Sequence, residues 1–106
     1  MNVVSGTVNF TRRMDDATVR TADVSIGDLR RVIDELDAVP GGPAESPFAA
    51  DAVVLLEESI ERAAMTGRNP VPDGQAEAIH WALERLMTDN LELSPGLRSL
   101  RDVVAT

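Results

Sequence analysis

The chain has 106 residues, a length typical of one domain, and a formal net charge of −8 from 18 Asp and Glu residues against 10 basic residues. It contains no cysteine, which excludes a disulfide framework, a thiolate zinc site and a cysteine nucleophile. Hydrophobic residues make up 43% of the chain but aromatic residues only 3%, so its core must be aliphatic.

The hydrophobic residues do not form long runs. The longest uninterrupted aliphatic stretch is Ala52 to Leu56, far short of the about 20 residues that a membrane-spanning helix needs. Residues 1–10 also lack the basic start and apolar run of a signal peptide. We therefore expect a cytoplasmic protein with no membrane partner.

Residues 1–24 differ in pattern from the rest of the chain. Val4, Val8 and Phe10 alternate with polar residues, and a second stretch of β-forming residues runs from Thr18 to Val24. This pattern predicts a β-hairpin that turns through residues 12–16. The alternative is a flexible segment that becomes ordered only on a partner, and the sequence leaves both open.

Capping residues mark the starts of four helices in residues 25–106. Ser25 with Asp28 forms a capping box, and Asp73 is the expected cap of a later helix. Ser46 and Ser94 are each followed by proline, which is favoured at the first helical position because its missing N–H is not needed there. Apolar residues at helical spacing extend the four helices over residues 25–39, 46–67, 73–89 and 94–106.

Short connections between these helices favour antiparallel neighbours. The predicted fold is therefore mainly α, a small four-helix bundle over residues 25–106 with a β-like hairpin or flexible segment at residues 1–24; the alternative is an α+β fold. Residues 67–74 contain two prolines and are expected to be a rigid connector between helices, with recognition by Arg68 and Asn69 as the alternative.

Acidic residues are concentrated between residues 28 and 61, where nine acids stand against two arginines and carry −7 of the net charge. This concentration disfavours direct binding to nucleic acid or to anionic membranes. It is either a solvated surface that keeps the protein soluble or a docking surface for a basic protein partner, of which the extreme form is a nucleic-acid mimic. The candidate docking residues are Asp34, Asp37, Glu57 and Glu58.

Glu77 and His80 have the Glu-x-x-His spacing that places a carboxylate and an imidazole on one helical face, as in ferritin-like metal-binding bundles. Glu61, on the preceding helix, is the third candidate ligand. Because the chain has one histidine, a full site of this kind needs a homodimer. The simpler interpretation is a surface pair between His80 and Glu84, at positions i and i+4.

Trp81 is the only tryptophan, and it falls outside the main apolar stripe of its helix, on a face with Glu77 and Glu84. It is expected either to pack under the N-terminal segment or to anchor a protein interface, where tryptophan is enriched. Trp81, Glu77 and Glu84 are therefore candidate interface residues.

The remaining motifs do not indicate an enzyme. The sequence lacks a phosphate-binding loop, a dinucleotide-binding glycine pattern, a nucleophile elbow and a second histidine, and Ser46 and Ser94 are explained as helix caps. No cofactor is expected. The function that the sequence favours is a small regulatory or accessory module that binds another protein and can form a homodimer, with a metal-binding bundle and a nucleic-acid mimic as the alternatives.

Overall fold

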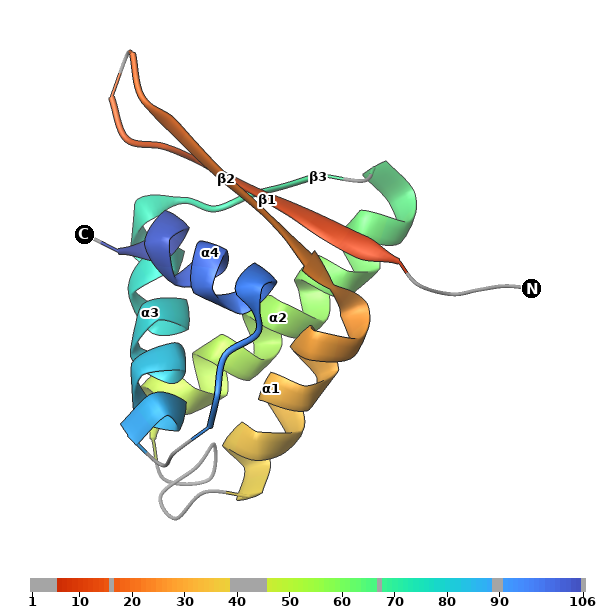
Figure 1. Ribbon diagram of the computed structural model, residues 1–106, viewed down its shortest axis with the longest axis vertical. Coiled ribbons are helices and arrows are strands. Elements are labelled where there is room, and N and C mark those ends of the chain that lie inside the picture. Colours follow the sequence, from red (N-terminus) through yellow and green to blue (C-terminus); the bar gives the residue numbers. More distant parts are fainter. Residues whose placement is uncertain (1–5, 16, 39–45, 67, 89–90, 106) are drawn as a thin grey trace.

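The computed structural model of the chain describes residues 6–15, 17–38, 46–66, 68–88 and 91–105 (Figure 1). Of these residues, 66% are helical and 19% lie in strands. The protein has an α+β fold, because a three-stranded mixed sheet accompanies four helices. The predicted four-helix bundle is therefore wrong, and the reason is that the sheet is part of the same core as the helices.

The N-terminal segment forms a β-hairpin, so the flexible alternative is wrong for its described residues. Strand β1, Thr7–Arg13, pairs antiparallel with β2, Val19–Ser25. Alternate residues of β1 are buried, which shows that the helices cover one face of the hairpin and leave the other to solvent. The hairpin turn extends beyond the helices in Figure 1.

The turn of the hairpin lies at residues 14–18, about two residues later than the sequence predicted. The N–H of Met14 donates to the carbonyl of Thr18, and the carboxylate of Asp15 accepts from the N–H groups of Ala17 and Thr18 at 2.8 Å each. These donors, Ala17 first, lower the pKa of Asp15 because they favour its charged form. The turn is therefore favoured above the ordinary carboxyl pKa and loses this support as the pH falls through the lowered pKa.

A third strand, β3, occupies Arg68–Pro70, where the sequence predicted only a connector. It pairs parallel with β1 and completes a sheet of order β2-β1-β3. Asn69 is buried, and its Nδ2 donates to Ser59 Oγ while its Oδ1 accepts from Arg62 Nη1. Asn69 is therefore committed to holding β3 against the adjacent helix, and its predicted recognition role is not supported.

The four helices are α1 (Ile26–Ala38), α2 (Pro47–Thr66), α3 (Asp73–Thr88) and α4 (Pro95–Val104). The predicted caps are confirmed at Ser25, Ser46 and Ser94, whose hydroxyl oxygens accept from amides three residues later. Asp73 is different: the carbonyl of Pro72 accepts the first helical bonds, so Asp73 lies inside the first turn. Among the helices that the structure describes, none has both the length and the apolar character needed to cross a membrane.

The core is aliphatic, as composition predicted, and one cluster joins the hairpin to all four helices. Its largest fully buried side chains include Phe10 from β1, Leu36 from α1, Leu56 from α2, Leu83 from α3 and Leu100 from α4. Phe48 of α2 and Met87 of α3 are large apolar residues that are exposed by 41% and 37%. The core therefore leaves part of the apolar surface of α2 and α3 uncovered.

The guanidinium of Arg12 is buried within this core. Its Nη1 donates to the carbonyls of Val103 and Ala105 at 3.2 and 3.0 Å, and its Nε donates to Asp73 Oδ1 at 3.1 Å. On β2, the residue opposite Arg12 is Arg20, whose Nη1 donates to the carbonyl of Asp102. Two arginines thus satisfy the free carbonyls and the partial negative charge at the C-terminal end of α4.

Replacing Arg12 tests how much these hydrogen bonds contribute to the free energy of unfolding. We expect Arg12→Met to lower the free energy of unfolding by about 2–4 kcal/mol, because two carbonyls at the end of α4 lose their charged donor. Arg13→Met, at the exposed neighbouring position, should change it by less than about 0.5 kcal/mol. Urea unfolding of both variants measures the difference, and equal effects would contradict the assigned role of Arg12.

Helix α4 approaches β2 closely at Gly96. A Cβ atom at this position would lie 2.8 Å from the carbonyl oxygen of Asp23 and 3.4 Å from the Cα of Val24. Both are backbone atoms and cannot rotate away. Glycine is therefore required for α4 to pack along β2.

A matched pair of glycine variants tests this contact. Gly96→Ala should lower stability by about 1–3 kcal/mol, since α4 must move away from β2. Gly74→Ala, in the first turn of α3, meets no atom within 4 Å and should raise stability by up to about 1 kcal/mol through helix propensity. Thermal unfolding measures the midpoint temperature of both variants. A shift of both midpoints in the same direction would contradict the close packing at Gly96.

Candidate functional site

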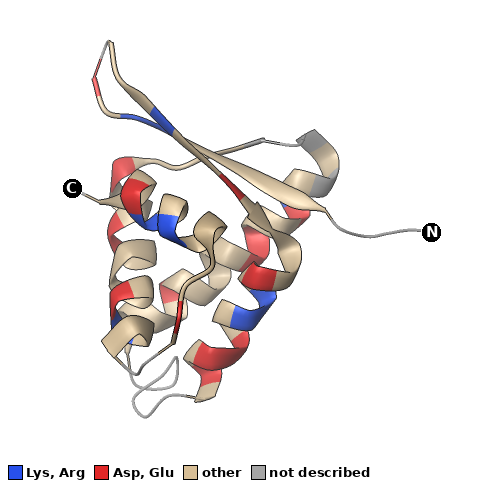
Figure 2. Cartoon of the chain, viewed as in Figure 1, with Lys and Arg blue, Asp and Glu red and all other residues tan. Residues whose placement is uncertain are grey.

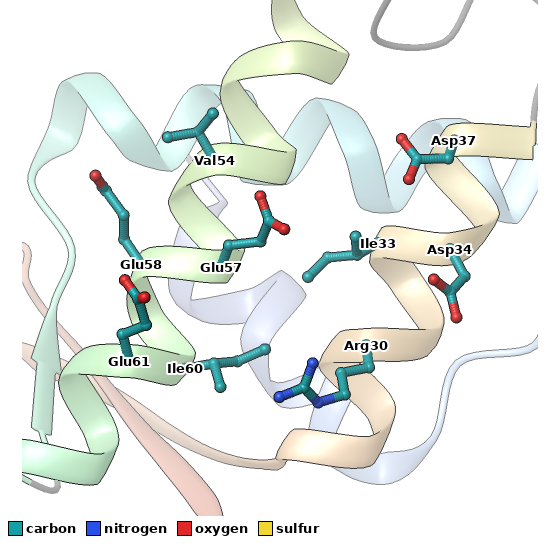
Figure 3. Close-up of a pocket in the computed structure, with 9 residues that line it drawn as sticks. All are labelled: Arg30, Ile33, Asp34, Asp37, Val54, Glu57, Glu58, Ile60 and Glu61. Carbon is teal, nitrogen blue, oxygen red and sulfur yellow. The ribbon is translucent and has the colours of Figure 1, made fainter.

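An open groove of about 680 Å³ runs between α1 and α2. Figure 3 shows its lining. We call it the acidic groove, because five carboxylates and a single arginine line it together with three aliphatic residues. From α1 come Arg30, Ile33, Asp34 and Asp37, and from α2 come Val54, Glu57, Glu58, Ile60 and Glu61.

The floor of the acidic groove is apolar. Ile33 of α1 and Ile60 of α2 point toward one another between the two helices (Figure 3), and both pack with the core. Val54 lies nearer the start of α2 than Ile60 does, and it is 51% exposed. A bound group would therefore meet aliphatic side chains between the carboxylates, which a purely solvated acidic surface does not offer.

The carboxylates of the acidic groove face solvent without partners. Within the described part of the chain, none of Asp34, Asp37, Glu57, Glu58 and Glu61 makes an ion pair or a side-chain hydrogen bond. Their spacing brings like charges together, since Glu57 and Glu61 are four residues apart and Glu58 and Glu61 three. Figure 2 shows acidic residues along α1 and α2, and others on α3, α4 and the hairpin. The groove thus concentrates a negative potential, because five carboxylates stand against one arginine, Arg30.

Sequence analysis identified four of these five acids as docking residues, and the structure brings all four together. Glu61, which was assigned to a metal site, lies in the same groove. The apolar floor was missed, because Ile33 and Ile60 were taken as ordinary core positions and Val54 was assigned no role. The signal for it was the width of the apolar stripe on α2, which exceeds what one neighbouring helix can cover.

Glu84 has a structural role that differs from its predicted place in an interface. Its Oε1 accepts from Arg101 Nε and Nη2 at 3.0 and 2.8 Å, and it lies 3.5 Å from His80 Nε2. The expected pairing of His80 with Glu84 is therefore present, and Arg101 joins it from α4. Glu84 thus links α3 to α4 through Arg101.

The three candidate metal ligands are not brought together within one chain. Trp81, beside His80, stacks on Phe48 at the start of α2, whereas Glu61 lies thirteen residues further along that helix, about 20 Å away at 1.5 Å per residue. Glu77 is exposed on α3. Across the described residues, no three His, Cys, Asp or Glu side chains are grouped so as to hold a metal ion.

Trp81 packs against α2 and not under the N-terminal hairpin. Its ring stacks on Phe48 with centroids 5.9 Å apart and planes inclined by 22°. Trp81 is half-buried and Phe48 is 41% exposed, so the pair covers the end of the core while presenting aromatic surface to solvent. Trp81 is thus covered in part by Phe48 of α2 and remains partly exposed.

Comparison of the chain with protein-family models, with curated proteins and with solved structures gave no match.

Replacing one acid in the groove and one outside it should have opposite effects on stability. Glu61→Gln removes repulsion with two glutamates on α2 and should raise the free energy of unfolding by about 0.3–1 kcal/mol. Glu84→Gln weakens the bond to Arg101 and should lower it by about 0.5–1 kcal/mol. Thermal unfolding at low salt measures both, and a destabilised Glu61→Gln variant would show that the groove carboxylates are paired in solution.

Proposed function

We propose that the protein is an interaction module that binds a basic segment of a protein partner in the acidic groove. The observation that supports this is the arrangement of five unpartnered carboxylates around an aliphatic floor. A surface that served solubility alone would need the charge but not the groove. A surface that binds arginine or lysine side chains needs both.

Arginine and lysine match this arrangement because each has an apolar stem and a charged end. Their methylene groups would lie on Ile33 and Ile60, while the guanidinium or ammonium groups reach the carboxylates at the rim. Each exposed ion pair contributes about 0.2–1 kcal/mol, so a segment with several basic residues gains affinity by forming several pairs at once. The same negative potential disfavours phosphate groups, which argues against nucleic acid as the ligand.

Binding of a short arginine-rich peptide tests the proposal. The double variant Asp34→Asn, Glu57→Gln should weaken binding by about threefold for each carboxylate removed, as measured by isothermal titration calorimetry. Binding of the unmodified protein should also weaken with added salt.

The control for this experiment is Glu35→Gln, Glu92→Gln, which removes the same charge from exposed positions outside the acidic groove. It should bind the peptide nearly as well as the unmodified protein. Equal losses in the two double variants would mean that only net charge matters, and the proposed site would then be wrong.

A further inference from the structure

A second, smaller hollow lies on the other side of α2, between α2 and α3. It has a volume of about 210 Å³ and is lined by Asp51, Val54, Leu55, Gly74, Gln75 and Ala78. Val54 also lines the acidic groove, so the two hollows adjoin each other across the surface of α2. A ligand seated in the groove can therefore continue into this hollow without leaving the protein surface.

The aromatic pair of Phe48 and Trp81 lies next to the hollow along α2 and α3. Asp51 follows Phe48 by three residues on α2, and Trp81 follows Ala78 by three on α3, so the stacked rings lie one helical turn beyond the hollow. Phe48 and Val54 are 41% and 51% exposed, although both are large apolar residues. Val54, Leu55 and Ala78 of the hollow are thus followed along α2 and α3 by Phe48 and Trp81. We call these five residues the apolar strip.

We infer that the basic segment of the partner crosses α2 and inserts a bulky apolar side chain into the hollow between α2 and α3. This inference rests on the proposed function, because the acidic groove fixes the charge of the segment. Asp51 and Glu58 stand beside the apolar strip on α2 and extend the negative potential to it. The occupant is therefore a protein segment in which arginine or lysine residues accompany an apolar anchor.

A second copy of this chain fits the surface less well. Two chains that each carry a net charge of −8 repel one another. Several arginines are also engaged within the fold, since Arg12 and Arg20 bind the end of α4 and Arg101 binds Glu84. A basic segment from a different protein is thus the complementary ligand.

The geometry sets the spacing within that segment. A helix with its side chains is about 10 Å across, which an extended chain spans in about three residues. The apolar anchor should therefore stand about three residues from the nearest arginine or lysine.

A designed peptide tests the inference. Its arginines are followed about three residues later by a leucine, and a control peptide has serine in place of that leucine. Because Trp81 is the only tryptophan and lies one helical turn from the hollow, its fluorescence reports on ligands bound beside it. The leucine peptide should change the emission of Trp81 and bind about tenfold more tightly than the serine peptide, as expected for burial of an aliphatic side chain.

Two valine variants of the protein complete the experiment. Val54→Ser should lower the affinity for the leucine peptide more than the affinity for the serine peptide. The substitutions in the protein and in the peptide are then coupled in a double-mutant cycle. Val19→Ser is the matched control, because Val19 is also 51% exposed but lies on the hairpin. It should leave the affinity for both peptides unchanged.

The outcomes separate this inference from the proposed function. Equal affinity for the leucine and serine peptides would overturn the apolar anchor while leaving basic recognition by the groove in place. Failure of both peptides to bind would overturn the proposed function and the inference together. A dimer in sedimentation equilibrium that dissociates on Val54→Ser would show that a second copy occupies the strip, which also overturns the inference.

Discussion

A guanidinium group in an apolar interior has lost its hydration and must find acceptors there. Arg12 finds three: the carbonyls of Val103 and Ala105 and the carboxylate of Asp73. These acceptors belong to the end of α4 and the start of α3, so the middle strand of the sheet fixes both helices. Helices α1 and α2, which carry the acidic groove, pack in the same core cluster as these two helices and the hairpin.

Helix starts were predictable because they depend on neighbours in sequence: a serine, a proline and the amides of the next turn. The hairpin was predictable for the same reason, although its turn was misplaced by about two residues. Strand β3 was not predictable, because its three residues pair with β1 from 59 positions away and contain a proline and an asparagine. The burial of Arg12 also depends on partners that are distant in sequence. The local alternation of polar and apolar residues therefore placed Arg12 wrongly in the hairpin turn.

The candidate site was predictable in its charge and not in its shape. Asp34, Asp37, Glu57 and Glu58 stand out in composition, since residues 28–61 contain nine acids and only two arginines. Whether two acidic helices form a groove depends on how they pack, which decides that Ile33 faces Ile60. Glu84 shows the same dependence on packing. The apolar pattern of α3 predicts that Glu84 faces solvent, but Arg101 of α4 donates to its carboxylate, and no pattern within α3 indicates that contact.

The contacts of Arg12 also bear on the order in which a growing chain can fold. Its two carbonyl acceptors are synthesised 91 and 93 residues after it. The hairpin is synthesised before α4 and can form its turn by itself, but Arg12 stays hydrated until the carbonyls at the end of α4 are present. Contacts this distant in sequence slow folding and leave apolar surface uncovered meanwhile. The hairpin therefore depends on α4 and cannot reach its final structure before that helix has been made.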